Sequence, residues 1–242
     1  MKNSNDFIQL NDLYNTVGQR FLLEGNVTMN ELQSSRNIFL ADTLATRKPR
    51  PKALETVAVV SGLPFTIEFR KKIKAIQLRI QEIIGDTLSY WVDESNLGVE
   101  LFIVKWPEQE FDLSQFSNGN DCLRRFERSP FCIKFHGIQI HRDGCVIARG
   151  FDEKARIREF RASLIQAEKI PSRQSNWSHV PLGRILEPFT DEAYEELINY
   201  VQKSQQECFH TENIKEVKMV HERRWYMEEV STIKSLALSS VV

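Results

Sequence analysis

The sequence predicts an α+β domain in which helices flank a mostly antiparallel sheet, with a helical segment in front of it. Three observations support this class. Apolar residues recur at helical spacing in several long segments. Between these segments, β-branched runs are bounded by glycine or proline. Two such runs are joined by Asp143-Gly144, a dipeptide preferred in tight hairpin turns. Helices on one face of an antiparallel sheet make an α+β domain.

The first 52 residues predict an N-terminal helical extension. Apolar spacing indicates one helix within 10–25 and a second within 29–45, and Thr28 with Glu31 forms a capping-box pattern before the second. The basic, proline-containing stretch 46–52 then ends that helix. Two alternatives stay open, because the extension could be a free arm that binds a protein partner or could pack on the domain surface.

From residue 53 onward we predict a second unit, 53–242, with the order β-α-β-β-β-β-α-β-α-β-β. Its first strand is a β-branched run ended by Gly62 and Pro64, and its first helix carries isoleucines along one face. The other boundaries follow the same signals. We expect strands at 54–65, 88–92, 98–106, in the hairpin 131–151, at 179–186 and as a pair in 213–238, with helices at 66–85, 152–168 and 190–206 and a loop with a short helix at 111–129.

The composition is that of an ordinary globular chain. Its 242 residues are 41% hydrophobic and 27% charged. A net charge of -1 gives no global basic field for nucleic acid, although a local basic groove is compatible with it. No run reaches the roughly 20 apolar residues of a membrane span. The first ten residues lack the apolar core of a signal peptide, so we expect a cytoplasmic protein.

The cysteines show no spacing typical of metal ligands, and we expect reduced thiols, no metal and no organic cofactor. They are Cys122, Cys132, Cys145 and Cys208. The sequence also contains no phosphate-binding glycine loop and no H-E-x-x-H or G-x-S-x-G motif.

Two predicted strands carry polar residues in a recognisable pattern. The stretch "SHVPLGRI" begins at Ser178, and "NLGVELFIVKWPE" begins at Asn96. Together with the element order, they resemble the two-histidine (2H) phosphoesterase superfamily, which includes 2′-5′ RNA ligases and RNA cyclic phosphodiesterases. The resemblance covers about Leu54 to Leu238.

That resemblance implies a specific chemistry. Family members carry two H-x-T/S motifs on central strands of a bilobal sheet, and they hydrolyse 2′,3′-cyclic phosphates or related 2′-5′ linkages without a metal. One neutral imidazole takes a proton from water while an imidazolium protonates the leaving oxygen. The hydroxyls two residues later face the same side of each strand, where they can bind phosphate oxygens.

The second motif is partly present. The resemblance places His179 at the catalytic histidine, and Arg184 matches an arginine that could supply charge to a phosphate. Pro181 stands at the hydroxyl position and offers neither a hydroxyl nor a backbone N–H. Ser178 is a further candidate for ligand binding.

The first motif is substituted at both positions. Gly98 aligns with the histidine and Glu100 with the threonine. A glycine cannot move a proton, and an ionised glutamate would repel a phosphate. Glu100 as general base with His179 as acid is a conceivable replacement pair, and Lys105 on the same strand is a basic candidate for ligand binding.

Other histidines are weaker candidates, because a lone strand histidine is more often structural. His136 and His141 are five apart and would lie on opposite faces of a regular strand. His210 is expected in a loop and His221 on a late strand.

We therefore expect a 2H phosphoesterase-like protein with impaired catalysis that binds a nucleotide or an RNA-end phosphate in the ancestral cleft. One alternative is an active, metal-independent cyclic phosphodiesterase that uses substituted catalytic residues. Another is a non-enzymatic scaffold that binds a protein partner through residues 1–52. A cleft filled by Trp106, Trp177 or Phe102 would favour the scaffold.

Overall fold

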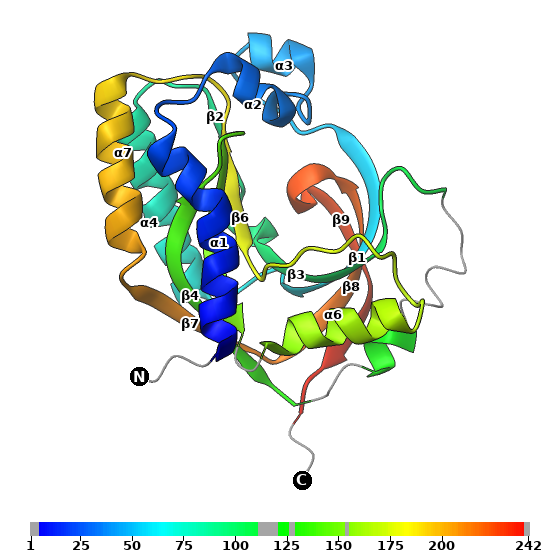
Figure 1. The fold of residues 1–242 in the computed structure, drawn as a ribbon. Helices are drawn as coiled ribbons and strands as arrows, with labels where there is room; N and C mark the ends of the chain where they lie inside the picture. Colours follow the sequence, from blue (N-terminus) through cyan, green and yellow to red (C-terminus); the bar gives the residue numbers. More distant parts are fainter. Residues whose placement is uncertain (1–4, 111–120, 126–128, 153–154, 240–242) are drawn as a thin grey trace.

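A computed structural model describes residues 5–110, 121–125, 129–152 and 155–239, and it contains two antiparallel sheets flanked by helices (Figure 1). This arrangement confirms the predicted α+β class. Most of the loop expected at 111–129 lies outside the described residues, although 121–125 are helical.

The four-stranded sheet has the order β3-β1-β8-β9. One of its faces packs against α6 (Arg156–Gln166) through apolar side chains such as Ile157 and Leu164, which are buried in the main core. The first strand of the unit, β1, therefore lies in the same sheet as the last two strands, and it pairs directly with β8. The strands are β1 (Ala53–Gly62), β3 (Gly98–Lys105), β8 (Glu216–Arg224) and β9 (Glu229–Ala237).

The five-stranded sheet has the order β2-β6-β5-β4-β7. Buried side chains of α4 and α7 belong to the main core with one face of this sheet. The elements are α4 (Ile67–Ile84), α7 (Asp191–Ser204), β2 (Ser89–Trp91), β4 (Phe131–Ile140), β5 (Cys145–Asp152), β6 (Val180–Ile185) and β7 (Cys208–Ile214).

Strand β7 corrects one prediction, because His210 was expected in a loop and lies in this strand. The buried positions of β7 include His210 and Glu212, whose Nε2 and Oε2 lie 2.8 Å apart. Buried and exposed residues alternate along β7, but the sequence does not show this alternation because two of the buried positions are polar rather than apolar. The chain crosses from the five-stranded to the four-stranded sheet directly after Ile214.

The N-terminal extension forms three helices rather than two: α1 (Asn5–Leu23), α2 (Met29–Arg36) and α3 (Ala41–Ala45). The predicted capping box of Thr28 and Glu31 is present at the start of α2. The single helix expected over 29–45 is interrupted because Phe39 forms a β-bridge with Pro51 and the Leu40 N–H donates to the Arg50 carbonyl.

Helix α1 packs across the five-stranded sheet on the face opposite α4 and α7 (Figure 1). On β5, Ile147 and Phe151 contact Tyr14 of α1, whereas Val146 and Ala148 belong to the main core on the other face. Tyr14 is fully buried, and its hydroxyl donates to the Gly150 carbonyl. The described part of α1 is thus packed on the sheet. The division of the chain into units 1–52 and 53–242 stays a prediction.

Within the described ranges, no helix has the length and apolar character needed to cross a membrane.

Candidate functional site

The positions of the second motif lie on the face of the five-stranded sheet that α1 partly covers. In the β5–β6 pairing, Cys145 faces Arg184 and Ile147 faces Pro181. Directly paired residues share a face, and His179, two residues before Pro181, continues along it. We call this face, with His179, Pro181 and Arg184, the β6 inner face.

The positions of the first motif lie on one face of the four-stranded sheet. Val60 pairs with Glu100, and Thr56 on the same strand pairs with Glu222 of β8. This face, with Glu100 and Glu222, is the β3 inner face, and the opposite face packs on α6. A Cβ added at Gly98 would lie 3.3 Å from the Ser61 carbonyl oxygen, so a histidine there would require a local shift.

The guanidinium of Arg161 joins the two motif strands. It donates through Nη2 to the carbonyl of Glu100 at 2.6 Å and through Nη1 to the carbonyls of Ser175 at 2.6 Å and Trp177 at 3.0 Å. Its Nε donates to the Leu101 carbonyl. Arg161 is almost fully buried, and it fixes the start of β6 beside β3.

The His179 ring is held neutral. Burial, with smaller effects of the neighbouring His141, Arg161 and Arg184, lowers the pKa of His179 to about 3. Its Nδ1 is buried and has no hydrogen-bond partner among the described residues. At neutral pH this imidazole can therefore accept a proton or a hydrogen bond, but it is not an imidazolium.

Arg184 is fixed in orientation by three side chains. Its Nε donates to the Tyr226 hydroxyl at 2.7 Å, and its Nη1 donates to the Ser35 hydroxyl and to Asp143 Oδ2, both at 2.6 Å. Its Nη2 has no hydrogen-bond partner in the described part of the chain. A planar guanidinium held in this way keeps donors available for an anion.

Two carboxyl groups lie near each other on the β3 inner face. Burial raises the pKa of Glu100, against a smaller opposite effect of Arg161. Burial, with repulsion from Glu100, raises the pKa of Glu222 to about 7, although the N–H groups of Met227 and Tyr226 oppose the shift. Glu100 Oε1 is buried and accepts no hydrogen bond from the described residues. The pKa shifts favour a protonated Glu100 and a neutral His179, the reverse of the protonation states considered from sequence.

Aromatic rings border His179. The ring centroids of Trp177 and His179 are 5.7 Å apart, and those of Trp177 and His141 are 5.3 Å apart, both edge to face. Tyr14 packs on Trp177 from α1 at 5.4 Å. Burial lowers the pKa of His141 to about 4, so this ring is also neutral.

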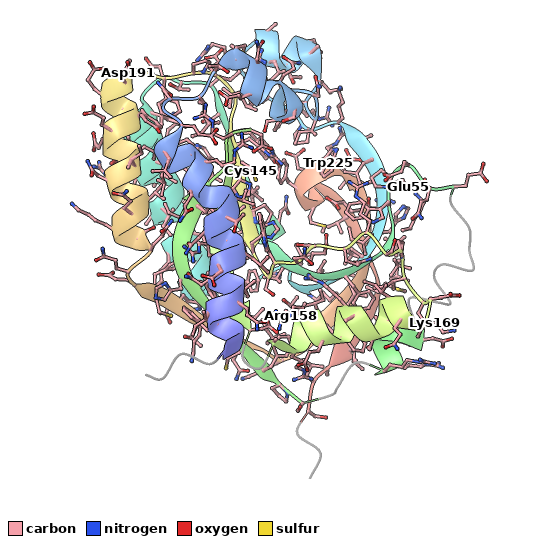
Figure 2. All side chains as sticks on the ribbon, in the orientation of Figure 1. Glu55, Cys145, Arg158, Lys169, Asp191 and Trp225 are labelled. Atoms are coloured by element: carbon pink, nitrogen blue, oxygen red, sulfur yellow. The ribbon has the colours of Figure 1, made fainter. Side chains whose placement is uncertain are left out.

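The other tryptophan and phenylalanine that could fill the site lie elsewhere. Phe102 is fully buried in the main core, and Trp106 donates through Nε1 to the Arg173 carbonyl and stacks under the Arg173 guanidinium. Trp177 is therefore the one member of that set that contacts a motif residue. Cys145 belongs to β5, and Trp225 follows β8. Figure 2 labels both residues and shows their elements on opposite sides of the middle of the molecule.

The remaining two predicted binding residues have structural partners. Lys105 is almost fully buried, and its Nζ donates to the carbonyls of Glu55 at 2.7 Å and Trp106 at 3.2 Å. Ser178 is buried beside His179, and its hydroxyl donates to Asp152 Oδ1 at 3.2 Å. Arg161 joins the strand of Glu100 to the segment before His179, and Arg184 lies near enough to His179 to affect the pKa of that ring, but Lys105 is bonded elsewhere.

His136 and His141 do not follow the spacing expected of a regular strand. The β4 register shifts between Phe135 and Ile138, and Gly137 has a φ of 76°, which is the conformation of a bulge. The extra residue returns both histidines to the same face. His136 there contacts Phe7 of α1, whereas His141 contacts Trp177.

No group of three or more His, Cys, Asp or Glu side chains that could hold a metal ion occurs among the described residues. The described side chains of the site are two neutral imidazoles, a fixed arginine and a pair of carboxyl groups.

Neither a protein-family model nor a curated protein matches this sequence. Solved structures do match the fold. TT0787 of Thermus thermophilus has a TM-score of 0.52 at 12% identity and covers 76% of this chain and 97% of its own. Escherichia coli LigT complexed with ATP has a TM-score of 0.51 at 14% identity, covering 77% of this chain and 99% of its own. LigT complexed with NADP+ also scores 0.51, at 14% identity, covering 76% and 98%.

These neighbours are 2H phosphoesterases, so the chain has the 2H phosphoesterase fold, as the motif strands predicted. About a quarter of this chain lies outside the matched part, whereas almost the whole of each neighbour is matched.

Three site residues were not identified from sequence: Arg161, Glu222 and Ser35. Arg161 lies in a helix with several other charged residues, and its burial follows from the position of that helix over β3. Glu222 is one of many acidic residues near the end of the chain. The sequence signal for Glu222 was its position two residues after the apolar Val220, because residues two apart on a strand share a face.

Proposed function

We propose that this protein binds a phosphate-bearing ligand, either a nucleotide or an RNA end, between the β6 and β3 inner faces. We further propose that it does not catalyse the two-histidine reaction. The observation that carries the proposal is the fixed guanidinium of Arg184, whose Nη2 makes no hydrogen bond in the described part of the chain and which lies near enough to His179 to lower the pKa of that ring. A guanidinium held in one orientation suits phosphate oxygens as a charged donor, and the neutral His179 ring can donate to them only in the tautomer that carries its proton on Nδ1. The LigT structures with ATP and NADP+ support a nucleotide as the first ligand to test.

Impaired catalysis follows from the groups at the motif positions. Gly98 has no imidazole, Pro181 has no hydroxyl, and the pKa of His179, about 3, keeps its ring unprotonated at neutral pH. The two-histidine reaction needs one imidazole as base and one imidazolium as acid. Only the base is available in this arrangement.

A second candidate is a cyclic phosphodiesterase in which Glu100 replaces the missing acid. Its raised pKa favours the protonated carboxyl, which could protonate a leaving oxygen while neutral His179 accepts the proton of water. This alternative predicts metal-independent turnover of 2′,3′-cyclic nucleotides that Glu100→Gln and His179→Ala both abolish.

The test of the proposal is calorimetric titration of the full chain with nucleoside monophosphates and with inorganic phosphate. Arg184→Lys keeps the charge but loses the fork, and we expect it to weaken phosphate binding at least about tenfold. The control is Arg173→Lys, because Arg173 is an exposed arginine whose charged partner is Glu108 rather than a group at a motif position. Equal effects of the two variants would contradict the assignment.

A further inference from the structure

The two inner faces differ in chemistry, and the difference constrains the ligand. Arg184 and His179 on the β6 inner face offer a cation and a ring nitrogen, whereas Glu100 and Glu222 on the β3 inner face offer carboxyl groups. A phosphate is attracted to the first pair and repelled by ionised forms of the second. A ligand that spans both faces therefore has an anionic end toward Arg184 and, toward the carboxyl groups, an end that donates hydrogen bonds.

The Glu100 carboxyl is built into the protein without a partner. Its Oε1 is buried, neither of its oxygens accepts a hydrogen bond from the described residues, and part of the side chain stays accessible. Arg161 lies beside it but directs its donors to backbone carbonyls, including that of Glu100 itself. Buried acceptors without partners cost free energy, so a donor from a ligand or from an ordered water is expected at Oε1.

The backbone fixes the carboxyl relative to His179. Arg161 joins the Glu100 carbonyl to the Trp177 carbonyl, which is two residues before His179. The unpartnered carboxyl and the unpartnered imidazole nitrogen are therefore presented from adjacent strands held by one guanidinium.

We propose that the ligand is a guanine nucleotide, bound with its phosphate toward Arg184 and His179 and with its base toward Glu100. Guanine presents two adjacent donors, N1–H and the 2-amino group, and a carboxylate accepts such a pair with both oxygens. Adenine lacks this pair of donors. Contact with two N–H groups also favours the ionised carboxyl over the protonated one. The inference rests on the proposed function and specifies its ligand.

The test compares GMP with IMP, which lacks only the 2-amino group, by calorimetry on the full chain. We expect wild-type protein to bind GMP at least about tenfold more tightly than IMP. Glu100→Gln should reduce that preference to within about twofold, because the amide offers one acceptor oxygen in place of two. Glu216→Gln, at an exposed glutamate on β8, is the matched control and should keep the full preference.

Glu100→Thr, which restores the hydroxyl of the family motif, is the second variant and should also lose the preference for GMP. Equal binding of GMP and IMP to wild type, with affinity that depends on Arg184, would overturn the guanine assignment and leave phosphate binding standing. A preference for GMP that survives in both Glu100 variants would overturn it as well. If neither nucleotide binds, both the inference and the proposed function fail.

Discussion

Ser35 of the N-terminal extension accepts a hydrogen bond from Arg184 Nη1 at 2.6 Å, across 149 positions of sequence. The same hydroxyl also contacts the Asp143 carbonyl in the β4–β5 turn. A residue of α2 therefore helps to hold the arginine that we assign to phosphate. In this protein the extension contributes to the candidate site directly.

Ser35→Ala should lower the affinity for nucleoside monophosphates by about threefold to tenfold, because Arg184 loses one of the partners that fix its orientation. The loss of a buried hydroxyl bonded to a charged group should also lower the free energy of unfolding by about 2 kcal/mol. Calorimetry and urea denaturation measure the two effects. Ser163→Ala, in α6, is the control and should change neither by much.

Arg161→Met should be strongly destabilising, by about 3 kcal/mol or more. The guanidinium satisfies several carbonyls that methionine cannot, among them those of Glu100 and Trp177. Arg79→Met removes an exposed arginine that pairs with Glu196, and it should cost less than about 1 kcal/mol. Urea denaturation of both variants checks the prediction, and similar losses would show that Arg161 does not hold the two strands together.

Glu222 should make the protein less stable as the pH rises. The pKa of this carboxyl is about 7 in the folded chain against 4.5 as the ordinary value, so the folded state retains a proton that the unfolded state has lost. The stability that this retained proton contributes is fully present below pH 4.5 and is lost as the pH rises to about 7. Glu222→Gln should therefore raise the free energy of unfolding at pH 8 by up to about 3 kcal/mol and change it little at pH 4. Denaturation at both pH values decides this, and a gain at pH 4 alone would contradict it.

His179→Ala should leave stability nearly unchanged while it lowers ligand affinity. The Nδ1 of this ring has no hydrogen-bond partner among the described residues, so its removal strands no donor or acceptor there. Thermal unfolding and calorimetry measure the two properties. A loss of several kcal/mol would show instead that His179 is a structural residue of the core.

Removal of residues 1–52 should prevent normal folding of the remainder. The truncation exposes Ile147 and Phe151 of β5, which Tyr14 covers, and it leaves Arg184 without Ser35. We expect broad, non-cooperative thermal unfolding of 53–242. A sharp transition near that of the full chain would establish 53–242 as a separate domain.

Sequence reasoning reached the fold because its signals are local. The hairpin at Asp143-Gly144, the β-branched run before Gly62 and the motif strand from His179 each appear within a few residues. They sufficed to place Glu100 and His179 on strands, whereas the bilobal sheet that contains both strands was implied only by the family resemblance. The β4 bulge at Gly137 was not predicted, because nothing in a single sequence distinguishes a bulged glycine from an ordinary strand glycine.

Other parts of the site depend on tertiary contacts. The apolar stripe of α1 predicts that the helix packs on something, but it does not say which face of which sheet receives Tyr14. The role of Arg161 is similar, since an arginine in a charged helix is usually solvated, and only the position of α6 over β3 makes it a bridge.

The most direct test of the central claim is a combined binding and turnover measurement with 2′,3′-cyclic nucleotides, on wild type and His179→Ala. The account predicts binding by wild type that the substitution weakens, with no hydrolysis by either protein. Hydrolysis by wild type that disappears in His179→Ala would contradict the claim of impaired catalysis and favour the Glu100–His179 pair. Absence of binding would contradict the assignment of the site itself.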